Sequence, residues 1–300
     1  MRLQLTFVIC LLLLLASGLA AAQDVEPAAG VSVAAAAQSR PRHALIVIGL
    51  PGDEERLTAF QEFVTSLQKA LQSAGVEQSH VWTLFGRGDE RYAAATRENI
   101  SSAVDQLSGQ LQPSSSLWVF LLGHGSEDGR TSAIHLPGPD LDARQWADLF
   151  AGIECQEEVF WLTQSASGGF VKALSRPGRV VIAATAASGE VNETEFPRVL
   201  TKVLQDDASD ANGDGVITVS ELFAAARMSV ATYYERRGLL ATEHPQLDDN
   251  GDGRGSEDAD SAAGIDIADP LAPKPDGVLA AKLVWRRVPV TLPAIEDQDQ

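Results

Sequence analysis

The sequence predicts an α/β protein with a mostly parallel sheet and helices on both faces. Short, continuous apolar runs recur along the chain, as in strands that are buried on both sides of a parallel sheet. Between them lie segments whose apolar residues recur at three- and four-residue steps, which is typical of amphipathic helices. This alternation favours a doubly wound, layered structure with right-handed crossovers.

The expected elements follow these patterns in chain order, starting at His43. Thr96 is suited to cap the start of a helix, Pro113 follows its end, and Gly75 suits a left-handed turn after the first helix. Helices are expected at residues 57–71, 96–111, 142–150, 196–204 and 221–237. Strands are expected at residues 44–48, 81–85, 117–122, 159–162 and 180–184, and at 278–285, where a last strand returns to the sheet edge.

Composition and charge narrow the function classes. The chain has 300 residues, of which 45% are hydrophobic, so disorder throughout is excluded. Its 41 Asp and Glu against 23 Lys and Arg give a net charge of −18, which argues against nucleic acid or anionic lipid as a partner and favours cations. After the first 22 residues no stretch reaches the ~18 apolar residues that spanning a bilayer requires, so no membrane span is expected.

The N-terminal residues 1–22 are typical of an export signal, with Arg2 followed by an apolar run and small residues up to Ala22. Cleavage near Ala22 would leave an exported protein, periplasmic or secreted, that begins with a flexible linker over residues 23–42. Cys155 would be its only cysteine, which excludes an internal disulfide and predicts a small buried residue. Residues 291–300 are expected to form a disordered tail.

Two neighbouring strands are followed by residues capable of chemistry. His124, between two glycines, ends the third strand, and a Ser- and Gly-rich segment at 163–170 ends the fourth. Ligands of parallel sheets bind at the carboxyl ends of strands, so these residues are expected to meet at one edge. An exposed imidazole can act as a general base, and the N–H of Gly125 can donate to a developing negative charge. A turn histidine without a role remains the alternative.

The order of these motifs resembles the caspase-fold cysteine peptidases of the legumain and GPI-transamidase branch. In that family a His-Gly pair follows the third strand, and a Cys followed two residues later by Ser-Gly follows the fourth; here His124-Gly125 and Ser167-Gly168 match. The resemblance covers roughly residues 43–187 and implies a caspase-like three-layer sandwich over residues 43–290. It also implies that the partners are peptide or protein segments.

Ser165 stands where the family has its nucleophilic cysteine. A thiol is partly ionised near neutral pH, whereas an alcohol needs a base that is held in one tautomer, usually by a carboxylate. Glu127 and Asp128 are the acidic residues nearest to His124 in sequence. The sequence favours a silent, peptide-binding relative. Two alternatives stay open: an active serine-variant hydrolase, acting on peptides or esters with the N–H groups of Gly125 and Ser165 as oxyanion hole, and a structural or adhesive module stabilised by calcium.

A calcium site is predicted at residues 210–221, which match the twelve-residue EF-hand loop at every diagnostic position. Gly215 supplies the sharp turn at position 6. The expected ligands are the side chains of Asp210, Asn212, Asp214, Thr218 and Glu221 and the carbonyl of Val216. Calcium is therefore the expected cofactor, bound weakly and as a structural ion.

A second acidic loop over residues 248–260 begins in the same way, with Asp248, Asn250 and Asp252 at the ligand positions. Its position 12 is Ala259, which has no side-chain oxygen. An incomplete second metal loop and a solvated acidic turn are both compatible with this pattern.

Overall fold

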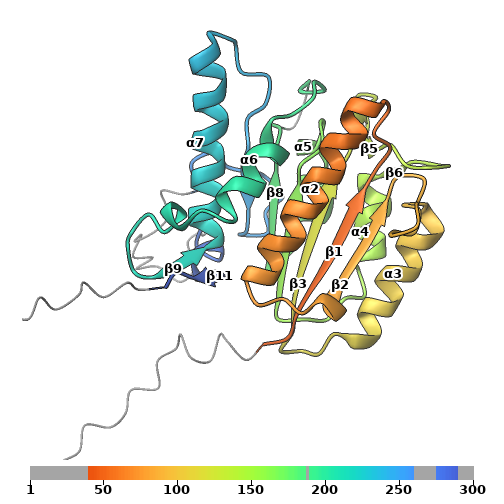
Figure 1. Ribbon diagram of the computed structural model, residues 1–300, viewed down its shortest axis with the longest axis horizontal. Helices are drawn as coiled ribbons and strands as arrows, with labels where there is room; N and C mark the ends of the chain where they lie inside the picture. The colour runs from red at the N-terminus through yellow and green to blue at the C-terminus, as the bar shows by residue number, and fades with distance from the viewer. Residues whose placement is uncertain (1–39, 187–188, 260–274, 290–300) are drawn as a thin grey trace, which may run out of the picture.

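The structure, a computed structural model, describes residues 40–186, 189–259 and 275–289 (Figure 1). The expected export signal, residues 23–39 of the expected linker and the expected C-terminal tail lie outside the described residues. Among the described helices, none combines the length and the apolar character needed to cross a bilayer.

The centre of the molecule is a six-stranded sheet in the order β10-β8-β7-β3-β1-β2. Its strands are parallel except for β10, which runs antiparallel to β8 at one edge. The predicted α/β class with a mostly parallel sheet is confirmed. The strands are β1 (Arg42–Ile48), β2 (Val81–Phe85), β3 (Ser116–Leu122), β7 (Glu157–Leu162), β8 (Arg179–Ala183) and β10 (Gln246–Asp248).

Helices cover both faces of this sheet and make three layers, with α2 crossing in front of the strands in Figure 1. Successive strand residues point to opposite faces, so Ile46 packs with α2, α6 and α7, whereas Val47 packs with α3, α4 and α5. The helices are α2 (Glu54–Ser73), α3 (Arg97–Gln110), α4 (Ala143–Leu149), α5 (Gly168–Leu174), α6 (Phe196–Val203) and α7 (Val219–Arg237). Short 3-10 helices occupy Gln78–His80 (η2), Asp207–Ser209 (η3) and Ala280–Lys282 (η5).

Polar side chains define the starts of the helices. Asp53 accepts a hydrogen bond from the N–H of Arg56, and Thr96 accepts one from the N–H of Asn99, which confirms the expected helix start. Gly75 has a φ of +81°, a left-handed conformation that suits glycine after a helix. Local sequence and sheet packing therefore agree in this part of the chain.

Two regions differ from expectation. The segment after β3 forms a small antiparallel sheet of β4 (Gly125–Glu127), β5 (Ser132–Ile134) and β6 (Leu141–Asp142), strands too short to show a pattern. The expected last strand at 278–285 begins only at Val284, and its expected return to the sheet edge is wrong, because β11 (Val284–Arg287) pairs with β9 (Val216–Thr218) in a separate two-stranded sheet.

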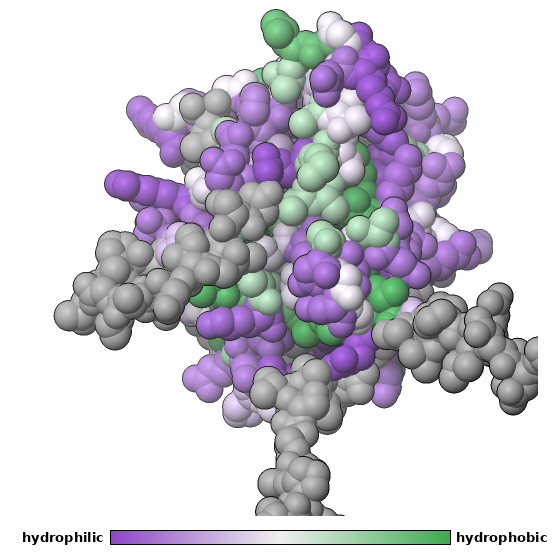
Figure 2. Space-filling view, turned by 90° about the vertical axis from the view of Figure 1, so that its left-hand side faces the viewer, coloured by the Kyte–Doolittle hydropathy of each residue, from purple (hydrophilic) through white to green (hydrophobic). Residues whose placement is uncertain are grey.

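The surface on the α7 side is shown in Figure 2, where hydrophilic residues flank an apolar band. Large apolar side chains exposed in the described residues include Met228 on α7 and Leu239 and Leu240 just after it. The core itself lies between the sheet and the helices, and it contains the buried Trp118, Trp146, Trp161 and Trp285.

Candidate functional site

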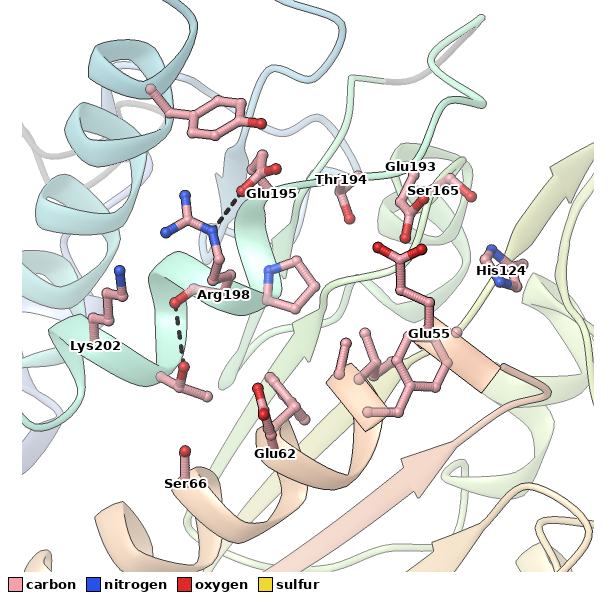
Figure 3. A pocket seen from close by; sticks show the side chains of 18 of the residues that line it. Glu55, Glu62, Ser66, His124, Ser165, Glu193, Thr194, Glu195, Arg198 and Lys202 are labelled. Atoms are coloured by element: carbon pink, nitrogen blue, oxygen red, sulfur yellow. Dashed lines mark hydrogen bonds and ion pairs between the residues drawn. The ribbon is translucent and has the colours of Figure 1, made fainter. Parts of the chain in front are cut away.

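His124 and Ser165 meet at one edge of the sheet. They follow β3 and β7, which are adjacent and parallel with Leu121 paired to Leu162. Both residues line a single cleft of about 1050 Å³, whose other walls come from α2, α6 and the end of α7 (Figure 3). The structure thus brings together the two residues that the sequence singled out.

The hydroxyl of Ser165 is held by one backbone unit. Its Oγ accepts a hydrogen bond from the N–H of Gly125 at 3.0 Å and donates to the carbonyl of Gly125 at 3.2 Å. A Cβ atom at position 125 would lie 1.9 Å from the Ser165 carbonyl oxygen, so only glycine allows this approach. The Gly125 N–H, expected as an oxyanion donor, is therefore directed to the serine itself.

His124 is oriented by a backbone carbonyl. Its Nε2 lies 2.9 Å from the carbonyl oxygen of Pro51, in the loop between β1 and α2. A carbonyl can only accept, so Nε2 carries the hydrogen and Nδ1 is the acceptor of the neutral ring. The ring also packs against Phe60, with centroids 6.0 Å apart. Within the described residues His124 and Ser165 form no hydrogen bond with each other.

The group that orients the imidazole of His124 next to Ser165 is thus the carbonyl of Pro51, which the sequence did not suggest. Glu127 and Asp128 do not contact the imidazole: Asp128 accepts hydrogen bonds from the N–H groups of Arg130 and Thr131 in the hairpin turn, and Glu127 lines a different pocket. A main-chain carbonyl leaves no residue-type signature, so no sequence signal pointed to it.

The turn after Ser165 has an unusual backbone. Ala166 has a φ of +54°, the left-handed region that non-glycine residues seldom adopt, and its N–H donates to the carbonyl of Glu190. Ser167 is fully buried and hydrogen-bonds Thr185 after β8. Two neighbouring chain segments therefore hold this turn in one conformation.

The lining of the cleft is rich in carboxylates. Glu55 and Glu193 lie on the side of Ser165 and His124 in Figure 3, and Glu193 forms an ion pair with Arg56 at 2.7 Å. The lining residues include the acidic Glu55, Glu62, Glu193, Glu195 and Asp206 and the basic Arg198 and Lys202. Carboxylates outnumber cations, so the cleft favours a positively charged ligand.

A buried carboxyl group lies behind this cleft and was not anticipated. Glu243 is only 1% exposed and accepts hydrogen bonds from the N–H groups of Glu195 and Phe196, at the start of α6, and from the hydroxyl of Tyr234. Burial raises the pKa of Glu243 to about 7. The group fixes the start of α6, which forms one wall of the cleft.

Cys155 does not belong to this site. It precedes β7, whereas Ser165 follows that strand, so the two lie at opposite ends of the sheet. The side chain is half-buried, and its Sγ contacts the carbonyl of Glu157. Burial, together with the charge of Glu158, raises the pKa of the thiol to about 12, which leaves it protonated and unreactive.

The predicted calcium loop is folded around Asp210. This carboxylate accepts hydrogen bonds from the N–H groups of Gly213, Asp214 and Gly215. The Oδ1 of Asn212 accepts from the N–H of Asp214 at 2.8 Å. These bonds wind the first half of the loop around its acidic side chains.

The second half of the same loop enters α7. The Oδ1 of Asp214 accepts from the N–H of Val216, and Thr218 caps the helix. Glu221 completes a capping box with Thr218 and accepts from the N–H of Ala211. No three His, Cys, Asp or Glu side chains in the described part of the chain are placed to hold a metal ion. Glu221 is held by the helix cap and by the N–H of Ala211 in this structure.

The loop at residues 248–253 repeats the same turn. Asp248 accepts from the N–H groups of Gly251 and Gly253, and Asn250 accepts from the N–H of Asp252. Ala259, at position 12, is 2% exposed and packs in the apolar core. The second loop therefore repeats the first half of the loop at residues 210–221 and has no side-chain oxygen at position 12.

Comparison with known proteins finds structural likeness without a sequence match. No family model matches the sequence, and no curated protein matches it. The solved structures that resemble it include the crystal structure of the Drosophila initiator caspase Dronc, at 12% sequence identity and a TM-score of 0.48, with 71% of this chain and 81% of that chain covered. At this identity and overlap the likeness assigns no activity.

Proposed function

We propose that this chain is an exported, calcium-binding homologue of the caspase-fold peptidases, which binds peptide or protein segments in the cleft without cleaving them. The proposal combines the motifs at residues 124–125 and 165–168 with the shared cleft at the strand ends.

The observation that carries the proposal is the pair of hydrogen bonds between Ser165 and Gly125. An alcohol becomes a nucleophile when a base removes its proton during attack. Here the proton of Ser165 is donated to a backbone carbonyl, and the oxyanion donor is occupied by the serine oxygen. The cleft is retained while the nucleophile is not activated.

The charge of the cleft supports a basic peptide as the ligand. Glu55 and Glu62 line the cleft and form no ion pair within the described residues, so their charges are available to a ligand. A peptide with lysine or arginine side chains complements these charges.

Binding can be tested with labelled peptides that differ only in charge. Replacing Glu55 and Glu62 together by Gln is expected to weaken binding of a lysine-rich peptide about tenfold, measured by fluorescence anisotropy. Ser165→Ala is expected to leave it unchanged, and Glu98→Gln, on the opposite face of the sheet, is the matched charge control. Equal binding of all variants would remove the cleft as the binding site.

One observation favours the second candidate, an active serine-variant hydrolase: Pro51 holds His124 in the tautomer whose Nδ1 is free to accept a proton. We expect no turnover of peptides or esters by the wild type, and slow cleavage by Ser165→Cys, because a thiolate needs less help from the base. Wild-type turnover that disappears in Ser165→Ala would establish the hydrolase instead. Inactivity of Ser165→Cys would show that His124 does not serve as base.

The calcium part of the proposal concerns residues 210–221 and is supported by the donor chemistry. Carboxylate, amide and carbonyl oxygens are the ligands that calcium prefers, and the loop supplies them from positions 1, 3, 5, 7 and 12. When bound, calcium would tie the loop to the start of α7. Its role is to stabilise the fold next to the cleft, not to take part in chemistry.

A further inference from the structure

A second pocket lies behind the turn that carries Ser165. It has a volume of about 390 Å³ and is lined by the β4–β5 hairpin, the start of α5 and the loop after β10. Gly168 and Gly169 belong to this pocket, whereas Ser165 lines the cleft. The turn at residues 165–169 is therefore the common wall of two sites.

The charge of this pocket is opposite to that of the cleft. Its lining contains three cations, Arg130, Lys172 and Arg254, and one carboxylate, Glu127. Among the described residues none of the three cations forms an ion pair. In a chain with a net charge of −18, cations outnumber carboxylates in the lining of this pocket.

The remaining lining is mostly polar, and its glycines leave the main chain uncovered by side chains. It contains glycines at five positions and a single large apolar residue, Val171, so an apolar ligand finds little surface. Ser132 is 2% exposed, and its Oγ has no hydrogen-bond partner in the described residues. A Cβ atom at Gly169 would lie 2.0 Å from that oxygen, so the orphaned hydroxyl is at the pocket wall.

Backbone N–H groups beside glycines, hydroxyl groups and cations are the chemistry that proteins use to bind oxyanions, and this pocket is lined by all three. We propose that this second pocket is an oxyanion-binding site, which takes a phosphate or carboxylate group between Arg130, Lys172 and Arg254. The site is distinct from the cleft and does not depend on the function proposed for Ser165.

The first test measures binding of inorganic phosphate to the purified protein by calorimetry and by NMR at constant ionic strength. Phosphate is expected to bind with a dissociation constant in the millimolar range, and chloride is expected not to bind measurably. Lys172→Gln and Arg254→Gln are each expected to weaken binding about tenfold, because each removes a charge-assisted hydrogen bond. Lys69→Gln, an exposed lysine on α2 outside the pocket, is the matched control and should bind as the wild type does.

A second arm identifies the source of the oxyanion. A short peptide with one glutamate is compared with its glutamine counterpart under the same conditions. Preference for the glutamate peptide, lost in Lys172→Gln, supports a carboxylate ligand, and binding of phosphate alone supports a free anion. The proposal is overturned if neither probe binds more tightly than chloride, or if Lys69→Gln weakens binding as much as Lys172→Gln does.

Discussion

The loops at residues 210–221 and 248–259 begin with the same pattern of ligand residues and fold into the same turn. In both, the first Asp accepts N–H hydrogen bonds from the residues three and five positions later. They differ at the last position: the first loop ends at Glu221, a half-buried carboxylate, whereas the second ends at Ala259 inside the core. The first six residues therefore determine the shape of the turn. The twelfth residue determines whether the loop ends in a carboxylate or in an apolar core residue.

The surroundings of the two loops differ as well. Asp248 and Asp249 are buried, and Asp276 packs against them by accepting from the N–H groups of Asp249 and Asn250. Hydrogen bonds to the buried carboxyl groups of Asp249 and Asp276 therefore connect the second loop to residues 276–280. In the first loop only residues 211–214 are exposed, and its carboxylates accept hydrogen bonds from the loop's own N–H groups.

The largest effect is expected from supplying the missing ligand. Ala259→Glu places a carboxylate in the apolar core, which should lower the free energy of unfolding by about 4 kcal/mol. The same substitution at Ala211, exposed in the first loop, is the control and should change stability little. Urea unfolding with and without calcium measures both. Recovery of Ala259→Glu by calcium would show that the second loop lacks only its twelfth ligand.

The next effect concerns the buried carboxyl groups. Burial raises the pKa of Asp276 to about 7, from an ordinary value of 3.8. Because the folded state prefers the protonated form, this group's contribution to stability is complete below the ordinary pKa and is lost as the pH rises through 7. The wild type is expected to lose about 2 to 3 kcal/mol between pH 5 and pH 8 from this residue.

Asp276→Asn keeps the accepting oxygen and removes the charge, so it should flatten this part of the profile and be more stable than the wild type at pH 8. Glu243, whose pKa is also about 7, lies beneath the cleft. Glu243→Gln should therefore remove a separate part of the same slope. If Asp276→Asn has the same dependence of unfolding free energy on pH as the wild type, the buried carboxyl group of Asp276 is not its cause.

The smallest effect is expected from calcium. At about ten times the dissociation constant, binding to the first loop should add about 1.4 kcal/mol to the free energy of unfolding. Glu221→Ala should abolish the response, while Asp252→Asn, in the second loop, should preserve it. Thermal melting with calcium and with chelator measures the difference. Identical melting in both would remove calcium from the first loop.

Much of the fold could be predicted because strong local patterns and sheet packing agree. The strand at 81–85 is found at those residues, and Thr96 caps the helix after it. The edge strand β10 was missed because only Leu247 of its three residues is apolar. Its position depends on pairing with β8, which no local pattern records.

The candidate site could be predicted in part for a similar reason. His124 and Ser165 follow recognisable strands, so parallel pairing was enough to bring them together. The carbonyl of Pro51 and the buried Glu243 reach the site through the tertiary fold. Neither has a neighbour in sequence that reveals its role.

The guanidinium of Arg42 has a consequence for how the chain matures. At the start of β1 it donates to the carbonyl oxygens of Val284 and Trp285, more than 240 residues later in sequence. The guanidinium also donates to the carbonyl of Ala74, but the two bonds to β11 can form only after residue 285 has been made. A nascent chain that emerges from its N-terminus onward would remain incompletely locked until residue 285 is available, a period in which escorting factors or proteases have their best access.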